Sequence, residues 1–332
     1  MQSGRRKLPA LMLAGIGLLG CGDRSTAAGP APLVLEATLP LAGVQGRIDH
    51  LAIDPPHKRL FVAELGNGSI EALDLATGRS LGRVGGLKEP QGVAYLPARN
   101  ELAVATGGDG LVRFYRADDL TFIGSVAVGG DADNLRLDAR GRVVVGYGDG
   151  ALAVIDPATR AVVAKMPLPG HPEGFQLDGD KAYVNVPDAG TVVSIDLAAG
   201  RESAHWRNIG GRFNFPLALE PGGRRFAVIH RMPGKLAIMD RATGQVQQSL
   251  GTCGDSDDAF FDATRHRLYV VCGGGGVDVF DTTGGHYTLR ARLPTRSGAR
   301  TGWFSPDLDR LYVAARERPG APAAILVFRP AT

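Results

Sequence analysis

The chain has 332 residues, of which 44% are hydrophobic and 21% are charged, so it is long enough and apolar enough to bury a sizeable core. It carries 37 Lys and Arg against 34 Asp and Glu, but three of the bases lie between Arg5 and Lys7, which leaves 34 against 34 in the rest. The sequence contains no Lys/Arg-rich run. A nucleic-acid-binding protein needs a basic face that releases counterions, so the charge pattern excludes that class.

Residues 1–20 predict a signal peptide. A basic start is followed by an apolar segment from Leu8 to Leu19, which at about 12 residues is shorter than the roughly 20 that a membrane-spanning helix needs. The sequence Leu18-Leu19-Gly20-Cys21 resembles the bacterial lipobox. In that motif the signal is cut before the cysteine, and the thiol receives a diacylglyceryl group. The alternative is an ordinary signal peptide that is cut elsewhere, with Cys21 incidental.

The lipobox resemblance implies an exported lipoprotein that faces the periplasm. Gly22, rather than Asp, follows the cysteine, which favours the outer membrane over the inner. Residues 21–31 are small and polar and include Pro and Gly, so they predict a flexible tether. No second linker interrupts residues 32–332, which therefore predict one domain, expected to be a monomer attached to the membrane through the lipid alone.

Seven copies of one motif fill residues 48–332. Each copy begins with a short apolar strand, and a turn, a second strand, a Gly/Asp hairpin and a third strand follow. The seven openings are IDHLAID at Ile48, QGVAYLP at Gln91, DNLRLDA at Asp133, EGFQLDG at Glu173, PLALEPG at Pro216, DDAFFDA at Asp257 and RTGWFSP at Arg300, spaced 40 to 43 residues apart. This period, with four strands in each unit, is typical of the blades of a β-propeller.

The first copy shows the expected strands, at residues 50–53, 59–63 and 69–75. The Gly-rich hairpin between the second and third strands supplies the positive φ angles that tight turns require. The last copy is one strand short, because the chain ends soon after a strand at residues 323–328. A surplus strand at residues 33–39 fills this gap and removes the open edge. The sequence therefore predicts an all-β, seven-bladed propeller closed by its N-terminal strand.

Two cysteines remain in the predicted mature chain, Cys253 and Cys272. Thiols in an oxidising compartment are expected to pair, so a disulfide is the first interpretation. A Cys/Cys/His metal site that uses His230 is the alternative.

The loops that lead into the innermost strands, and those that leave the second strands, lie on one face of a propeller. They bring polar residues of all seven copies to one mouth of the central channel. The candidate ligand-binding residues there are Asp49, His50, Gln91, Asp133, Asn134, Glu173, His230, Asp257, Asp258 and Arg300. Carboxylates with an arginine suit a polar ligand, and a divalent cation such as calcium is possible because it prefers oxygen ligands. Alternatively, the acids accept backbone N–H bonds and fill a wet channel.

Motifs of several chemistries are absent from the sequence. It contains no CxxCH for haem, no HExxH zinc helix, no GxSxG nucleophile elbow and no Walker-type phosphate loop. Their absence leaves metal-assisted hydrolysis open, since that chemistry needs only converging carboxylates and a bound water. No catalytic residue is assigned, and no cofactor is expected apart from the possible cation.

The repeats resemble a known family. KAYVNVPDAGTVVSIDLAAGR from Lys181 is similar to the YVTN repeat of WD40-like β-propellers. Further strings resemble a YncE-like group of exported bacterial propellers: GRIDHLAID at Gly46, LKEPQGVAYLP at Leu87, GGDADNLRLD at Gly129, GHPEGFQLD at Gly170 and DSDDAFFDATRHRLYVVCGGG at Asp255. The resemblance covers residues 32–332 and implies fold and export rather than one activity.

Two functional hypotheses follow. The first is a non-enzymatic, lipid-anchored scaffold that binds a small polar ligand or a periplasmic protein at its channel mouth. The alternative is a metal-dependent hydrolase similar to the lactonases among related propellers. It would use Asp49, Glu173, Asp257 or Asp258 as metal ligands and His50 as a base. A role as an accessory to a periplasmic metal or redox system rests only on His230 and the two cysteines.

Overall fold

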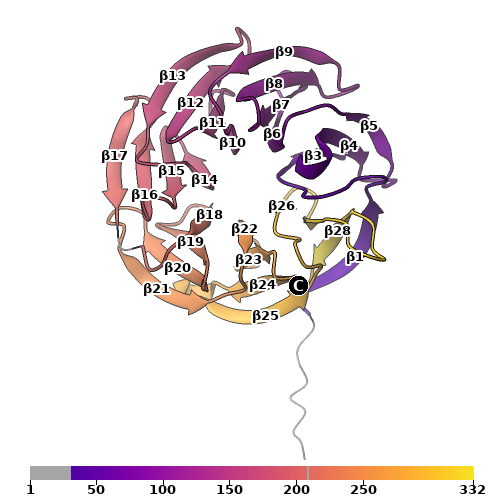
Figure 1. Cartoon of the computed structure of the whole chain (residues 1–332). Helices are drawn as coiled ribbons and strands as arrows, with labels where there is room; N and C mark the ends of the chain where they lie inside the picture. The colour runs from indigo at the N-terminus through magenta and orange to yellow at the C-terminus, as the bar shows by residue number, and fades with distance from the viewer. Residues whose placement is uncertain (1–30, 208) are drawn as a thin grey trace, which may run out of the picture. The chain divides into compact units, whose positions relative to one another are not determined.

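The computed structural model describes residues 31–207 and 209–332. The predicted signal peptide, Cys21 and nearly all of the predicted tether lie outside the described residues. Pro32–Thr332 form a ring of seven four-stranded antiparallel sheets (Figure 1). Among the described residues, no helix is long and apolar enough to cross a membrane. The predicted all-β, seven-bladed propeller is confirmed.

Each blade is a meander of four strands that run from the channel to the rim, and the blades are numbered here in chain order. Blades 1 to 3 contain β2 (Leu51–Asp54), β3 (Arg59–Glu64), β4 (Ser69–Asp74), β5 (Ser80–Val84), β6 (Pro90–Leu96), β7 (Glu101–Thr106), β8 (Leu111–Arg116), β9 (Phe122–Ala127), β10 (Leu135–Leu137), β11 (Val143–Tyr147), β12 (Ala151–Asp156) and β13 (Ala161–Pro167). Blades 4 to 6 contain β14 (Phe175–Asp178), β15 (Lys181–Val186), β16 (Thr191–Asp196), β17 (Arg201–Trp206), β18 (Asn214–Leu219), β19 (Arg225–Arg231), β20 (Gly234–Asp240), β21 (Val246–Gly251), β22 (Ser256–Asp262), β23 (Arg267–Cys272), β24 (Gly276–Asp281) and β25 (Thr288–Pro294). Blade 7 contains β26 (Gly302–Ser305), β27 (Arg310–Ala315), β28 (Ala324–Pro330) and β1 (Leu33–Pro40).

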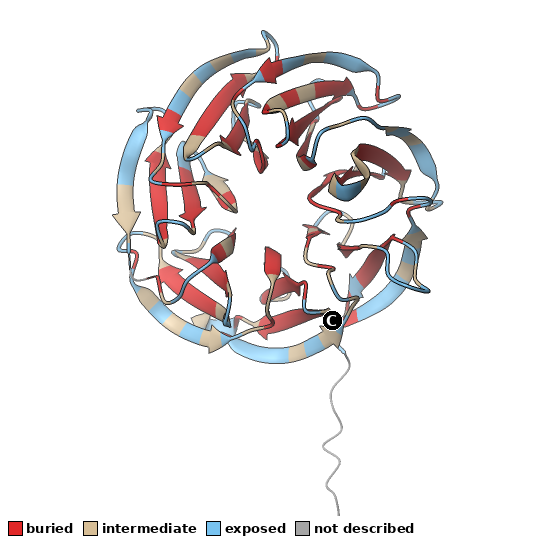
Figure 2. Cartoon of the chain, in the orientation of Figure 1, coloured by how far each residue is buried: buried red, intermediate tan, exposed pale blue. Residues whose placement is uncertain are grey.

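The hydrophobic core is divided among the blade interfaces rather than gathered at one centre. Seven clusters of buried side chains each join two neighbouring blades. One of them, for example, contains Phe61 from blade 1 and Val104 from blade 2. The three inner strands of a blade are mostly buried, whereas the outermost strand is largely exposed (Figure 2). Because each blade buries its faces against its neighbours, the ring is stable only as a closed whole.

Ring closure follows the prediction. Strand β1 pairs antiparallel with β28, from Leu33 opposite Pro330 to Pro40 opposite Ala324, and so becomes the outermost strand of blade 7. The guanidinium of Arg267 in blade 6 donates hydrogen bonds to the carbonyl oxygens of Pro32 (3.0 Å) and Ala331 (2.6 Å). This one side chain therefore binds the residue before β1 and the residue after β28, which lie side by side.

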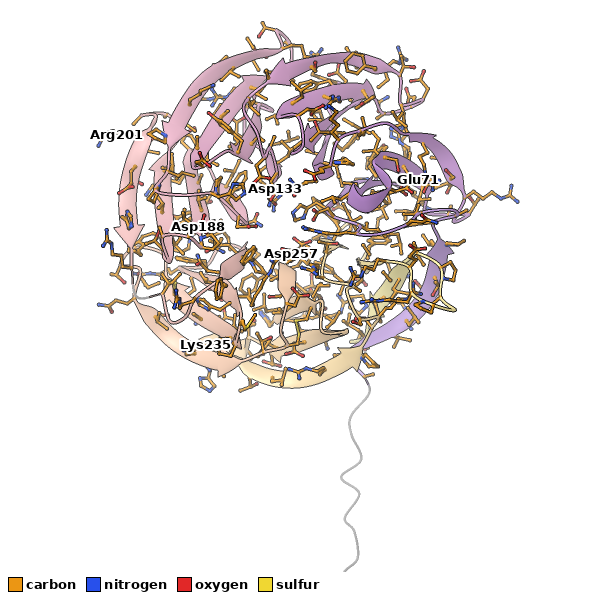
Figure 3. The ribbon with its side chains drawn as sticks, in the orientation of Figure 1. Glu71, Asp133, Asp188, Arg201, Lys235 and Asp257 are labelled. Carbon is orange, nitrogen blue, oxygen red and sulfur yellow. A yellow bond between two sulfur atoms is a disulfide. The ribbon has the colours of Figure 1, made fainter. Side chains whose placement is uncertain are left out.

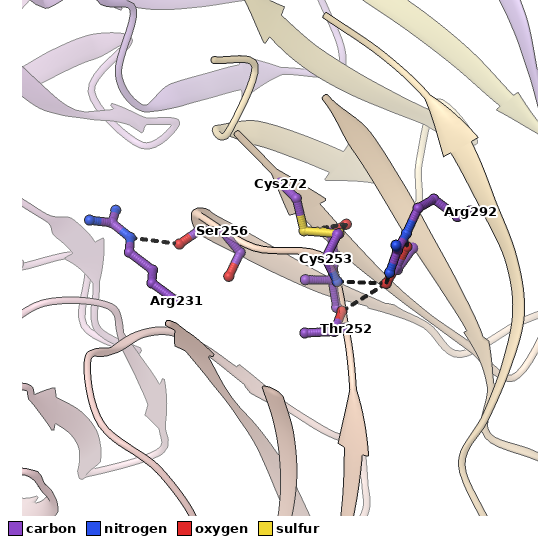
Figure 4. The surroundings of a disulfide bond; sticks show 8 residues. Arg231, Thr252, Cys253, Ser256, Cys272 and Arg292 are labelled. Carbon is purple, nitrogen blue, oxygen red and sulfur yellow. Dashed lines mark hydrogen bonds and ion pairs between the residues drawn. A yellow bond between two sulfur atoms is a disulfide. The ribbon is translucent and has the colours of Figure 1, made fainter. Parts of the chain in front are cut away.

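Cys253 and Cys272 form a disulfide, so the predicted pairing is confirmed and the Cys/Cys/His metal site is wrong (Figure 4). Cys253 lies in the loop between β21 and β22, and Cys272 ends β23. The backbone N–H of Cys253 donates to the carboxylate of Asp278 at 2.8 Å, and Arg292 also binds this carboxylate. Cys253 thus attaches the loop that leads from blade 5 into blade 6 to β23 and β24 of blade 6.

Candidate functional site at the channel mouth

The same backbone hydrogen bond positions the opening residue of several blades. The backbone N–H of Asp49 donates to Ala63 (2.8 Å), that of Asp133 to Gly146 (2.9 Å), and that of Glu173 to Asn185 (3.0 Å). Each acceptor lies near the end of the second strand of the same blade. Because the blades repeat around the ring, equivalent side chains project alike, and Asp133 and Asp257 lie beside the central channel (Figure 3).

Close contact between neighbouring blades explains the glycines among these openings. A Cβ atom on Gly92 would lie 2.1 Å from the carbonyl oxygen of Asp133, and one on Gly174 would lie 2.4 Å from that of Phe215. The backbone N–H of Gly174 donates to the same Phe215 oxygen at 3.1 Å. Any larger residue would push the blades apart, so these glycines keep the mouth narrow.

Two arginines bind acids on one side of the mouth. Arg47 contacts Asp49 at 2.9 Å, with Asp257 at 3.9 Å from the same Nη2 atom. Arg231 forms an ion pair with Asp257, donates to the carbonyl of Ser256 at 2.9 Å, and stacks on Phe215 with its Cζ atom 3.5 Å from the ring centre. This side of the mouth is therefore a satisfied network of opposite charges.

His50 and Asp258 form a second pair. Nδ1 of His50 lies 3.5 Å from Oδ2 of Asp258, and this oxygen accepts the backbone N–H of Gly302 at 2.9 Å. Burial opposes the charged imidazole, but the carboxylates, Asp258 foremost, raise the pKa of His50 to about 10. Burial also raises the pKa of Asp49 to about 7, although His50 and Arg47 act to lower it. At neutral pH His50 is thus a cation.

The acids of blades 3 and 4 have few partners. Asp133 is 8% exposed, and its only side-chain contact among the described residues is the amide of Asn134, at 3.4 Å. Glu173 forms no ion pair within the described part of the chain. Burial and the nearby carboxylates, Asp133 foremost, raise the pKa of Glu173 to about 9, and burial also raises that of Asp133. Glu173 therefore keeps its proton at neutral pH, and Asp133 forms no ion pair within the described residues.

Several buried oxygens of the mouth have no hydrogen-bond partner among the described residues. They are Asp49 Oδ1, Asp133 Oδ1, Asn134 Oδ1 and Asp257 Oδ2. Buried polar atoms in folded proteins nearly always have partners, and exceptions need an explanation. All four oxygens are acceptors, and one donor of the mouth, Arg47 Nε, is also without a partner, so acceptors predominate among the unused groups.

Three of the predicted residues lie apart from this cluster. Arg300 turns to Asp255 at 3.0 Å, and the amide of Gln91 donates to Asp131 at 3.2 Å. His230 is fully buried beneath its own hairpin, with Nδ1 3.4 Å from the carbonyl of Lys235, and burial lowers its pKa. The sequence pattern placed these residues in the right ring positions but could not give the directions of their side chains.

Two arginines of the site were missed from the sequence, Arg47 and Arg231. Arg47 precedes the opening acid Asp49 by two residues, and Arg231 directly follows His230 at the end of β19. The repeats align the opening residues and the ends of the second strands. Arg47 and Arg231 lie just outside these positions, and their long side chains reach the mouth from there. A comparison of flanking positions would have shown a base beside an acid.

No three His, Cys, Asp or Glu side chains converge closely enough to hold a metal ion among the residues that the structure describes. Two hollows of the described residues lie away from the mouth. One of about 860 Å³ lies against Trp206 and Gly244, and one of about 560 Å³ lies beside Arg241 and Asp178. Trp206 stacks on Tyr183 at 6.1 Å and serves packing. The mouth, with its unpartnered buried acids, remains the better candidate site.

A solved structure with the same fold is Kuenenia stuttgartiensis hydrazine synthase. It matches with a TM-score of 0.73 at 20% sequence identity, over 87% of this chain and 98% of the other. At this identity the likeness shows the fold alone, and 1818 chains of solved structures match the ring, so the fold does not indicate an activity. No family model matches the sequence, and no curated protein matches it.

Proposed function

We propose that the chain is a non-enzymatic binding scaffold whose channel mouth holds a small polar ligand or a polar segment of a partner protein. The observation that carries the proposal is the set of buried acceptor oxygens without partners, on Asp49, Asp133, Asn134 and Asp257. A rigid ring supports them, because the backbone N–H groups of Asp49 and Asp133 donate to their own blades and that of Asp257 donates to the next blade. Preorganised polar groups at a concave opening are what a binding site requires.

We further propose that the chain is an exported lipoprotein of the YVTN-repeat, YncE-like kind. The repeat strings and the lipobox-like sequence before Cys21 support this. A disulfide is also typical of an oxidising compartment. Strand β1 begins opposite Pro330, where β28 ends, which is the face away from the channel mouth.

The hydrolase alternative is not favoured by any contact at the mouth. A metal-dependent hydrolase needs several ligands around one ion. Of the acids named for that role, Asp49 pairs with Arg47, Asp257 with Arg231, and Asp258 with His50. His50, as a cation held by carboxylates, is also a poor general base at neutral pH.

Ligand capture tests the binding role. The mature chain is incubated with periplasmic extract, and the retained small molecules and proteins are compared by mass spectrometry with those on the Asp133→Asn/Glu173→Gln double variant. We expect a species that the parent retains and the double variant loses. Equal retention by both proteins would contradict binding at the mouth.

Lipid labelling tests the anchor. Cells that express the full chain are given labelled palmitate and fractionated, with Cys21→Ala as the matched variant. We expect label and membrane association in the parent chain and neither in Cys21→Ala. An unlabelled parent chain would overturn the lipoprotein proposal but leave the binding role untouched.

A further inference from the structure

We infer that the part of the mouth formed by Asp133, Asn134 and Glu173 binds an organic cation, an alkylammonium or guanidinium group. The inference rests on the proposed binding function and names the class of ligand. It is carried by the positions of these three side chains and by the burial and unpartnered oxygens of Asp133 and Asn134. Asp133 and Asn134 open blade 3, and Glu173 opens blade 4.

The two acids open adjacent blades. Asp133 and Glu173 hold equivalent positions, and each donates its backbone N–H to the second strand of its own blade, at 2.9 and 3.0 Å. Equivalent positions of adjacent blades are neighbours around the mouth, and Asp133 is the carboxylate that most raises the pKa of Glu173. A ligand between these blades can therefore reach both carboxyl groups.

The acceptors at this position are buried and unused. Asp133 is 8% exposed and Asn134 is 2% exposed, and Oδ1 of each has no hydrogen-bond partner among the described residues. With the carboxyl group of Glu173, three acceptor groups face a ligand that can supply N–H donors. An alkylammonium carries three such donors and no acceptor.

The charges of the mouth select a cation over an anion. Three of the cations at the mouth are already bound by carboxylates: Arg47 by Asp49, Arg231 by Asp257, and His50 by Asp258. A fourth, Arg136, has Asp258 and Asp133 nearby and donates to the carbonyl of Leu135 at 2.7 Å. An anionic ligand would have to displace a carboxylate or compete for Arg136, whereas a cation would supply the missing partner of Asp133. Charge-assisted N–H···O bonds to buried carboxylates are among the stronger polar contacts in proteins.

Coordination chemistry favours an organic cation over Ca²⁺. Calcium takes six to eight oxygen ligands. No three His, Cys, Asp or Glu side chains of the described chain converge on one point, and Asp133 and Glu173 supply only two carboxyl groups. An ammonium or guanidinium group is satisfied by fewer acceptors, at hydrogen-bond rather than coordination distances.

Calorimetry with matched probes tests the inference. The mature chain is titrated with butylamine and butylguanidine, and with butanol and butyrate, which carry the same alkyl group with a neutral or anionic head. Capped Gly-Lys-Gly and Gly-Arg-Gly, with Gly-Gln-Gly as their control, separate a protein side chain from a free amine as the source of the cation. Calcium chloride forms the last arm.

We expect the cationic probes to bind and butanol and butyrate not to bind. Asp133→Asn and Glu173→Gln should each weaken cation binding about tenfold or more, because the first removes a charge and the second removes an acid that a bound cation would cause to ionise. The control is Asp188→Asn, which removes an equal charge from an exposed site in the second hairpin of blade 4 (Figure 3). Its affinity should stay within about twofold of the parent. Circular dichroism checks that each variant is folded.

Three results would overturn the inference. They are the absence of binding by every cationic probe, preferred binding of butyrate, and binding of Ca²⁺ without the amines. If extract capture by the parent still depends on Asp133 and Glu173, the binding function survives and only the ligand class is wrong. If capture also fails, the proposed function falls with it.

Discussion

At the scale of single residues, the mouth tolerates charges that most protein interiors exclude. A buried carboxylate without a partner keeps its proton instead of paying for desolvation. Glu173 is such a group, with a pKa of about 9 caused first by burial and then by Asp133 and Asp257. Asp49, which has His50 and Arg47 beside it, reaches only about 7. The contrast shows how strongly neighbouring cations change the protonation state of an acid.

The raised pKa of Glu173 makes a prediction about stability. In the unfolded chain a glutamate ionises near pH 4.3, whereas Glu173 in the folded chain holds its proton up to about pH 9. Between these values the folded state binds more protons, so the free energy of unfolding falls as pH rises. Glu173→Gln cannot ionise and should unfold with a free energy higher by roughly 5 kcal/mol at pH 8.

Urea unfolding at pH 4 and pH 8 measures this effect. The gain in Glu173→Gln should appear at pH 8 and be nearly absent at pH 4. His50 and the other acids titrate alike in both proteins, so the difference between them isolates Glu173. A variant that is equally destabilised at both pH values would show that Glu173 is ionised and paired in the folded chain.

Asp258 makes a second residue-scale prediction, because it holds His50 in its charged form. Asp258→Asn keeps an acceptor for the Gly302 N–H but removes the charge that does most to raise the pKa of His50. That pKa should fall from about 10 toward the ordinary value near 6.5. A histidine whose pKa is higher in the folded state stabilises that state until the pH rises above the folded pKa. In Asp258→Asn this stabilisation by charged His50 should therefore be lost at a lower pH than in the parent.

An NMR titration of the imidazole signals checks this prediction. Asp255→Asn is the matched control, because Asp255 pairs with Arg300 rather than with His50. A His50 pKa that stays near 10 in Asp258→Asn would assign the shift to Asp49 and Asp133 instead.

What the sequence could predict at this scale was the ring position of each residue. The repeats placed Asp49, Asp133, Glu173 and Asp257 at one mouth because equivalent positions of equivalent blades lie together. They could not show that Arg231 reaches Asp257, or that Arg300 turns to Asp255. The partner of a long side chain depends on which residues surround it in the folded ring, and an alignment of the repeats does not give those neighbours.

At the scale of elements, each blade repeats one irregularity. The register between the third and fourth strands shifts once in every blade, at Ala72/Leu73 in blade 1 and at Val279/Phe280 in blade 6, for example. Such a bulge increases local twist, which a blade needs to curve from the channel to the rim. The strands themselves were predictable from their apolar alternation, but the bulges were not, because the sequence does not show which residue is left unpaired.

The disulfide is an element-scale device with a predicted consequence for the mouth. It fixes the loop that carries Asp255, Ser256 and Asp257 into β22, and it closes a sequence separation of 19 residues. Cys253→Ser/Cys272→Ser should lower the free energy of unfolding by about 3 kcal/mol in the chain-entropy model. Hydrogen exchange should also accelerate at residues 254–257, because the loop then lacks its covalent tie.

Urea unfolding and hydrogen exchange by mass spectrometry measure the two effects. The parent chain treated with reductant should resemble the double variant. Unchanged exchange at residues 254–257 would mean that the bonds from Cys253 to Asp278 and from Arg231 to Ser256 hold the loop without the disulfide.

At the scale of the whole molecule, the ring depends on one strand taken from the other end of the chain. Strand β1 covers the edge of β28 that would otherwise be open, and Arg267 ties Pro32 and Ala331 together across the join. This closure was predictable because a seventh blade with three strands and a surplus strand before the first repeat have one simple solution. The arginine tie was not, because it joins residues 235 positions apart in the sequence.

Removal of β1 should therefore open the ring. A chain that begins at Leu41 leaves β28 with unpaired backbone groups, and exposed strand edges promote aggregation. We expect it to aggregate or to unfold well below the parent, whereas a chain that begins at Pro32 should match the parent in thermal unfolding and in size on gel filtration. A synthetic peptide of residues 32–40 should restore the monomer by adding the missing strand in trans. A stable monomer that begins at Leu41 would show that the ring holds without its closing strand, and that blade interfaces alone supply its stability.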